Sequence, residues 1–277
     1  MKNLIIISMA LACLYGTPLS AASLTFLTEG RVVKVLNTEE VAGKAPVKTL
    51  QIDNVTDSRV VTYEGVLLAD LLDAVYGPMW KHYDAVTFTA QDGYRPVIPG
   101  SIIRQHSGLI AMREAGKQGF SSIRRENGEQ IDPGPFYLLW ENIHDHKANK
   151  ESWLSWPWQL ASIELTEFGR EFPRAAPPAT SSEKAKQGFL HFQQHCIKCH
   201  TINGEGSAVG PELNYPANVT EYWKREWLEK FIADPQSVRS SSTMTPFYRD
   251  VDNRPEIISQ IVAYLEAMSQ HKINPDN

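Results

Sequence analysis

The stretch Cys196-Ile197-Lys198-Cys199-His200 determines how the second half of this chain is interpreted. It has the form C-x-x-C-H, which is typical of c-type haem attachment. Two thiols three positions apart can form thioethers with the two vinyl groups of a haem, and the adjacent histidine then lies under the iron as proximal ligand. The spacing therefore predicts one covalently bound haem c at this site.

A redox dithiol, a structural disulfide and half of a zinc site are the alternatives for the same two cysteines. A thioredoxin-type dithiol belongs in a βαβ context, and a zinc site needs two further ligands at suitable spacing. Neither is evident in the sequence around Cys196. We therefore favour haem attachment.

The N-terminus has the pattern of a secretory signal peptide. A basic start (Met1-Lys2-Asn3) is followed by an apolar run over 4–14 and by small residues up to Ala22. The run is too short to span a bilayer, so we expect residues 1–22 to be cleaved and the protein to be exported to the periplasm without an integral membrane segment. An uncleaved anchor and a lipoprotein acylated at Cys13 are the alternatives.

Length and composition indicate two globular domains. The chain has 277 residues, of which 42% are hydrophobic and 21% charged, enough for two cores of ordinary size. Residues 172–182 contain three prolines and little to bury, which predicts an extended linker between domains at 23–171 and 183–277. Both domains have more acidic than basic residues, which excludes nucleic acid as an expected partner.

The periodicity of apolar residues differs between the two domains. In the first domain, one helical segment at 67–75 stands among alternating runs typical of strands, at 32–36, 50–52, 85–89 and 161–165. We expect an α+β domain there. The second domain has helical periodicity over 182–195, 220–233 and 255–270, which predicts an all-α domain.

The region from about 182 to 272 resembles the class I cytochrome c family. Gly188 and Phe192 lie eight and four residues before Cys196, as in the N-terminal helix of that family, and 261–265 resembles its C-terminal helix. The resemblance implies that these two helices cross, with Gly188 allowing the backbones to approach closely.

The same resemblance implies further haem contacts. Met244, nine residues after Pro235, is the expected sixth ligand, whereas Met268 falls within the last helix and is expected in the core. The carbonyl of Pro211 is expected to accept a hydrogen bond from the proximal imidazole. Trp223 is expected to contact a haem propionate, with an aromatic core role as the alternative.

One departure from the family is Phe231, where relatives often have a tyrosine whose hydroxyl can bond the methionine sulfur. The reduction potential of relatives therefore does not transfer to this chain. His191 and His195 precede the first haem cysteine and are expected to be surface residues.

The first domain resembles the molybdopterin-binding fold of the sulfite oxidase family. The resemblance rests on short motifs, at 63–72, 88–94, 126–130, 134–139 and 158–165. A cysteine thiolate ligates molybdenum in that family, but residues 23–171 contain no cysteine. We therefore expect a degenerate domain that recognises a partner or a small ligand, and molybdopterin is not an expected cofactor.

Three features of the first domain have weaker functional interpretations. Arg124-Arg125 could bind an oxyanion, although a basic pair before an Asn-Gly turn is usually solvated. The run His144-Asp145-His146, on an expected strand, could hold a metal but has no third ligand. A tryptophan cluster could form a docking surface, although core or interface packing is the favoured role; its members are Trp153, Trp156 and Trp158.

These features together predict an electron carrier rather than an enzyme. Ligation by His200 and Met244 would leave no open position on the iron, and the first domain would dock a redox donor, such as a periplasmic dehydrogenase, or an acceptor. One alternative is a molybdopterin-dependent oxidoreductase that passes electrons internally to haem. Another is a haem-based ligand sensor, which requires Met244 to be absent from the iron.

Overall fold

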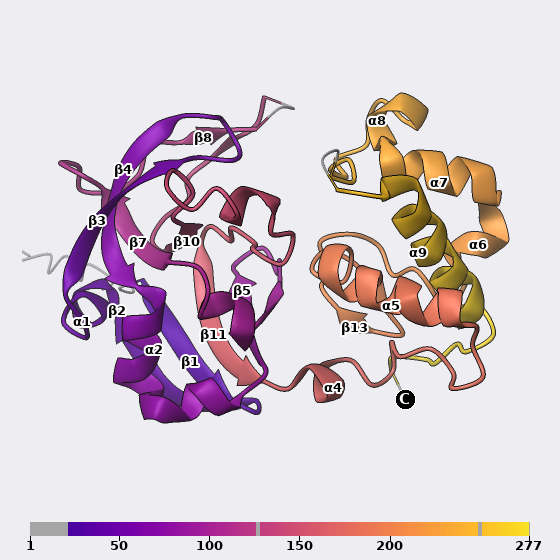
Figure 1. Ribbon diagram of the computed structural model, residues 1–277, viewed down its shortest axis with the longest axis horizontal. Helices are drawn as coiled ribbons and strands as arrows, with labels where there is room; N and C mark the ends of the chain where they lie inside the picture. Colours follow the sequence, from indigo (N-terminus) through magenta and orange to yellow (C-terminus); the bar gives the residue numbers. More distant parts are fainter. Residues whose placement is uncertain (1–21, 126–127, 249–250, 277) are drawn as a thin grey trace, which may run out of the picture.

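The computed structural model describes residues 22–125, 128–248 and 251–276 and consists of two domains. A sheet-rich N-terminal domain and a helical C-terminal domain lie side by side, joined by a segment that contains α4 (Phe168–Glu171) (Figure 1). The predicted two-domain layout is thereby confirmed. The predicted signal peptide lies outside the described residues except for Ala22.

Two sheets form the framework of the N-terminal domain. The first has the order β2 (Arg31–Asn37), β1 (Ser23–Thr28), β11 (Leu160–Thr166), β5 (Ala85–Ala90), β6 (Val97–Pro99), with β1 and β11 parallel. The second is antiparallel in the order β10 (Tyr137–Trp140), β7 (Gly108–Glu114), β4 (Val60–Leu67), β3 (Val47–Asp53). A separate two-stranded hairpin joins β8 (Ile123–Arg124) to β9 (Gln130–Ile131).

Short helices complete this domain. They are α1 (Thr38–Ala42), α2 (Leu68–Tyr76), η1 (Gly77–His82), α3 (Gly100–Ile103) and η2 (Ala148–Lys150). The helix predicted at 67–75 is confirmed as α2, whose Leu68, Leu71 and Leu72 are buried in the domain core. Burial of this apolar face, rather than helix propensity alone, accounts for the position of α2 against the sheets.

The C-terminal domain is built from helices. These are α5 (Glu183–His195), α6 (Val219–Tyr222), α7 (Arg225–Ala233), α8 (Pro235–Val238) and α9 (Arg254–Met268), with a small hairpin of β12 (Thr201–Ile202) and β13 (Glu205–Gly206). The helix predicted over 220–233 is broken between α6 and α7, because Trp223 and Lys224 both adopt extended backbone.

Helices α5 and α9 cross at Gly188, as the sequence predicted. A Cβ atom at Gly188 would lie 1.9 Å from the carbonyl oxygen of Gln260 and 2.9 Å from Cβ of Tyr264, so only glycine fits. The rings of Phe192 and Tyr264 pack beside the crossing with centroids 5.1 Å apart. Close backbone approach and aromatic packing therefore hold the two helices together.

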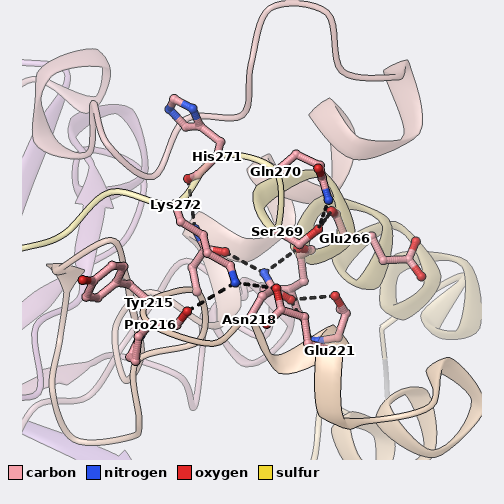
Figure 2. Close-up of polar contacts among 12 residues, drawn as sticks. Tyr215, Pro216, Asn218, Glu221, Glu266, Ser269, Gln270, His271 and Lys272 are labelled. Carbon is pink, nitrogen blue, oxygen red and sulfur yellow. Dashed lines mark hydrogen bonds and ion pairs between the residues drawn. The ribbon is translucent and has the colours of Figure 1, made fainter.

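Polar contacts fasten the C-terminal end of α9 to the preceding loops (Figure 2). The side-chain amide of Asn218 donates to the carbonyl of Leu265 at 2.9 Å, and Lys272 donates to the carbonyl of Pro216 at 3.2 Å. The buried amide of Asn214 donates to the carbonyl of His271 at 3.0 Å. These hydrogen bonds anchor the chain from Leu265 to Lys272 on the loop at 214–218.

The prediction that residues 172–182 form an extended linker is partly wrong. Phe172 and Ala175 are 3% and 0% exposed and belong to the core of the C-terminal domain. The hydroxyl of Tyr264 donates to the carbonyl of Ala175 at 2.6 Å, and Glu205 accepts the backbone N–H of Arg174 at 2.7 Å. Prolines restrict φ but do not prevent their neighbours from being buried, so 172–175 is part of the packed domain.

Within the described part of the chain, no helix combines the length and the hydropathy needed to cross a bilayer.

Candidate functional site

The C-x-x-C-H segment forms a tight turn at the end of α5. Cys196 caps the helix by donating its N–H to the carbonyl of Phe192 at 2.8 Å. The backbone N–H groups of Cys199 and His200 both donate to the carbonyl of Cys196 at 2.9 Å. Both cysteines are free thiols, so the structure contains no disulfide between them.

The imidazole of His200 is held in one orientation. Its Nδ1 lies 2.9 Å from the carbonyl oxygen of Pro211, the contact that the resemblance implied. Because a carbonyl only accepts, Nδ1 carries the proton and Nε2 keeps a free lone pair. Burial lowers the pKa of His200, against the hydrogen bond to Pro211, which favours the neutral form that can ligate a metal.

Glycine at position 210 lets the chain pass directly over this imidazole. A Cβ atom there would lie 2.5 Å from Cε1 and 2.7 Å from Nδ1 of His200. The N–H of Gly210 donates to the carbonyl of Cys199 at 2.6 Å, which ties the loop to the attachment turn. The ring of His200 is thus fixed by backbone on one side.

Glu212 fixes the loop that carries Pro211. Its carboxylate accepts four backbone N–H groups, those of Asn203, Gly204, Asn214 and Tyr215, at 2.8 to 3.1 Å. Burial raises the pKa of Glu212 and the hydrogen bonds lower it, with a net shift below its usual value. An ionised carboxylate that accepts several N–H groups forms strong hydrogen bonds, which stabilise the local backbone.

Met244 lies in the loop that follows α8 and is half-buried. Its N–H donates to the hydroxyl of Ser242 at 3.3 Å, and its carbonyl accepts the side-chain amide of Gln236 at 2.9 Å. Met268, by contrast, is fully buried in the core, as expected. Of these two methionines, only Met244 lies in a loop.

Trp223 is half-buried between α6 and α7. Its ring packs on Phe231 with centroids 5.0 Å apart. It also lies against the apolar core of the C-terminal domain, so the structure gives it a packing contact. A contact with a haem propionate stays a prediction.

The donor set of this site fits haem c. Two free thiols stand one turn apart beside a histidine whose Nε2 lone pair is available, and glycine 210 leaves no side chain against the ring. The thioether of Met244 is a soft, neutral ligand suited to iron in its reduced state. Cys196 and Cys199 would hold the haem covalently, and His200 and Met244 would be its axial ligands.

The prediction that His195 is a surface residue is wrong. Its ring packs against those of Phe247 and Tyr248, with centroids 4.7 and 5.7 Å away. Burial lowers the pKa of His195 to about 3, so it is neutral at ordinary pH. His191, one turn earlier, is half-buried and stacks on His195 at 6.2 Å. The loop that follows Met244 folds back over the last turn of α5, which sequence periodicity could not reveal.

The strand expected at His144-Asp145-His146 is also wrong, because this run forms a bend and a turn. Nδ1 of His144 contacts Glu141 at 3.0 Å, while Asp145 pairs with Nδ1 of His106 at 2.5 Å. In residues 22–125, 128–248 and 251–276, no three His, Cys, Asp or Glu side chains are grouped to hold a metal ion.

Arg124 and Arg125 line a surface pocket of about 590 Å³ in the N-terminal domain. Arg59 and Asp57, from the turn between β3 and β4, also line it, and no sequence pattern indicated their involvement. Arg125 pairs with Glu129 at 3.0 Å and lies over the ring of Trp158. Carboxylates therefore partly neutralise the guanidinium groups of Arg125 and Arg59.

The tryptophans have packing contacts. Trp153 packs edge-on against Phe168 with centroids 5.2 Å apart, and Trp156 and Trp158 lie against the apolar clusters of the N-terminal domain.

Lys198, within the C-x-x-C-H turn, is a residue that sequence reasoning missed. It is only 7% exposed, because the N-terminal domain packs against it. Its Nζ lies 3.4 Å from Oγ of Ser155 and 3.3 Å from the hydroxyl of Tyr248. No sequence pattern marks this contact, since it depends on how the two domains pack.

Comparison with known proteins supports the assignment of the C-terminal domain. Residues 185–269 match the family model Cytochrome c, so the chain contains a cytochrome c domain. The chain is also similar to cytochrome c oxidase subunit 2 of Alkalihalophilus pseudofirmus, with 34% identity over 90 residues. That similarity covers 30% of this chain and 25% of the relative, so the chain spans about a quarter of the length of the protein it matches.

Proposed function

We propose that this protein is an exported monohaem c-type cytochrome that carries single electrons between a redox donor and a redox acceptor. The observation that carries the proposal is the arrangement at His200. Its Nδ1 is bound by the carbonyl of Pro211, and two free thiols stand beside it in a C-x-x-C-H turn. The match of residues 185–269 to cytochrome c supports the haem electron-transfer role of the C-terminal domain.

Each residue contributes a separate property to the site. Bound haem c supplies a one-electron couple between Fe(III) and Fe(II). Cys196 and Cys199 anchor it, and Pro211 fixes the tautomer of His200. Met244 would be the second protein ligand of the iron besides His200, which would leave substrate no open site, and His/Met ligation favours a high reduction potential.

The proposal extends to location and partners. The signal-like pattern over 1–22 supports export, and the N-terminal domain would dock one redox partner, for example a periplasmic dehydrogenase. The relative in Alkalihalophilus pseudofirmus is a subunit of an oxidase, which is in line with a redox role for this domain.

Optical spectroscopy of protein expressed with residues 1–22 in place tests the proposal. We expect a low-spin haem c spectrum in the reduced protein and, in the oxidised protein, a methionine-to-iron band that Met244→Ala abolishes. Met268→Leu, a core substitution, is the matched control and should keep the band. A high-spin spectrum, or a band unchanged in Met244→Ala, would contradict the assignment of the sixth ligand.

The arginine-lined pocket is the one observation that favours the alternative of a molybdopterin-dependent oxidoreductase. Elemental analysis of the same sample separates the two functions. An electron carrier should contain iron and no molybdenum, whereas one molybdenum per chain would establish the alternative.

A further inference from the structure

The N-terminal domain covers the turn to which haem would be attached. Four segments meet there: residues 93–95 and Ser155 from the N-terminal domain, and the C-x-x-C-H turn and Ser207 from the C-terminal domain. The backbone N–H of Arg95 donates to the carbonyl of Lys198 at 3.2 Å. The hydroxyl of Ser207 donates to the carbonyl of Gly93 at 2.5 Å.

Ser207 connects this contact to the haem-binding turn itself. Its backbone N–H donates to the carbonyl of Ile197 at 3.0 Å and lies 3.3 Å from that of His200. Ser207 is only 2% exposed, so its hydrogen bonds are shielded from water. The C-x-x-C-H turn and residues 93–95 are therefore linked through one buried side chain.

Tyr94 and Ser155 are the residues of the N-terminal domain that shield the C-x-x-C-H turn. Tyr94 lies between Gly93 and Arg95, the two residues whose backbone contacts Ser207 and Lys198. Burial raises the pKa of the Tyr94 hydroxyl to about 12, and the charge of Lys198 opposes that shift. Ser155 is 4% exposed, and its hydroxyl lies beside Nζ of Lys198. A second hydrogen bond, from Gln194 to Oγ of Ser152 at 2.6 Å, extends the contact along α5.

The apolar cores of the two domains are also in contact with each other. Ala85 and Val97 of the N-terminal domain belong to the same buried cluster as Phe172 and Ala175 of the connecting segment. Arg95 adds an ion pair to Glu171 of α4 at 2.6 Å. The contact thus combines apolar burial with hydrogen bonds and an ion pair.

We propose that the N-terminal domain forms one wall of the haem site and raises the reduction potential by excluding water from the attachment turn. This proposal rests on the proposed function. The oxidised iron carries one more positive charge than the reduced iron, so a less polar surrounding disfavours oxidation. External redox partners then exchange electrons with the haem at a surface other than this turn.

Paired substitutions at Tyr94 test the proposal in the full-length holoprotein. Tyr94→Ala removes the ring and admits water to Lys198 and Cys199, whereas Tyr94→Phe keeps the ring and is the matched control. At the potential where the wild type is half reduced, we expect the Fe(III) to Fe(II) ratio to rise about threefold to tenfold in Tyr94→Ala, tenfold being 59 mV for one electron. Tyr94→Phe should stay within about twofold of the wild type on the same scale.

Amine acetylation followed by peptide mass spectrometry measures how accessible Lys198 is to solvent in the wild type and in the variant. In the wild type, Lys198 should react far more slowly than the exposed Lys117, and in Tyr94→Ala it should become reactive. A wild-type Lys198 as reactive as Lys117 would overturn the proposal. So would an unchanged potential in Tyr94→Ala when Lys198 has become reactive.

The failure of this proposal is distinct from failure of the proposed function. Absence of bound haem c, or an unaltered spectrum in Met244→Ala, would refute the cytochrome itself. A normal haem spectrum together with a reduction potential that Tyr94→Ala does not change would refute only the proposed role of the N-terminal domain as a wall of the haem site.

Discussion

Replacing Gly188 by alanine perturbs the helix crossing on which the C-terminal domain is built. The added Cβ atom would lie 1.9 Å from the carbonyl oxygen and 2.5 Å from the carbonyl carbon of Gln260. These are backbone atoms of α9, which cannot move aside without moving the helix. We therefore expect α5 and α9 to separate and the domain to lose stability.

The size of the effect follows from two opposing contributions. Overpacking of a well-packed core costs about 1 to 3 kcal/mol, and contact with backbone places Gly188→Ala near 3 kcal/mol. Alanine is favoured over glycine within a helix by about 1 kcal/mol. The free energy of unfolding should therefore fall by about 2 kcal/mol, which lowers the urea midpoint by roughly 1 M for a domain of this size.

Urea unfolding followed at the haem absorbance reports the unfolding midpoint of the C-terminal domain alone. A probe of one domain is needed because two domains can unfold independently. Gly169→Ala is the matched control, since Gly169 is helical and nothing lies within 4 Å of its added Cβ. That variant should equal or slightly exceed the wild type. Equal midpoints for Gly188→Ala and the wild type would refute the close crossing.

Three further predictions follow from the contacts around the site. Asn218→Ala removes the buried amide that donates to the carbonyl of Leu265 at 2.9 Å and should cost about 1 to 3 kcal/mol in urea unfolding. Lys272→Ala removes an exposed ion pair with Glu221 and an exposed hydrogen bond to the carbonyl of Pro216, and should cost less than about 1 kcal/mol. Equal costs for the two variants would contradict the reasoning. Gly210→Ala places a Cβ atom 2.5 Å from the imidazole of His200 and should convert low-spin haem to a high-spin or mixed spectrum; a wild-type spectrum would show that the ring is not confined. The pKa of Glu212 is lower in the folded protein than its unfolded value of about 4.3, so the stabilisation from its ionised carboxylate is present above that pH and is lost as the pH falls through the folded pKa. In urea unfolding at several pH values, the free energy of unfolding should fall less steeply with acid in Glu212→Gln than in the wild type. Parallel curves for the two proteins would exclude this role.

Local patterns predicted the elements whose neighbours are close in sequence. Apolar periodicity located α2 and α5, whereas the crossing at Gly188 was expected from the resemblance to class I cytochrome c. The contact between His200 and Pro211 was also expected, from the resemblance to class I cytochrome c. These features depend on local chain geometry, which residue type largely determines.

Features that depend on tertiary packing were missed or predicted wrongly. The burial of Lys198 requires Ser155, and the burial of His195 requires Phe247, both of which are more than forty residues away. Ala175 was assigned to a linker because prolines surround it, yet Tyr264 binds its carbonyl. A single sequence contains no direct signal for such pairs, since hydrophobic patterning reports burial but not the partner.

A redox titration of the full-length protein, followed at the haem absorbance, tests the central claim most directly. The account predicts one haem per chain that acid–acetone extraction does not remove, and a reversible transition with the slope of one electron, 59 mV per tenfold change in ratio. Protein without haem, haem that acid–acetone extracts, or a two-electron dithiol transition of 29.6 mV per tenfold would contradict it.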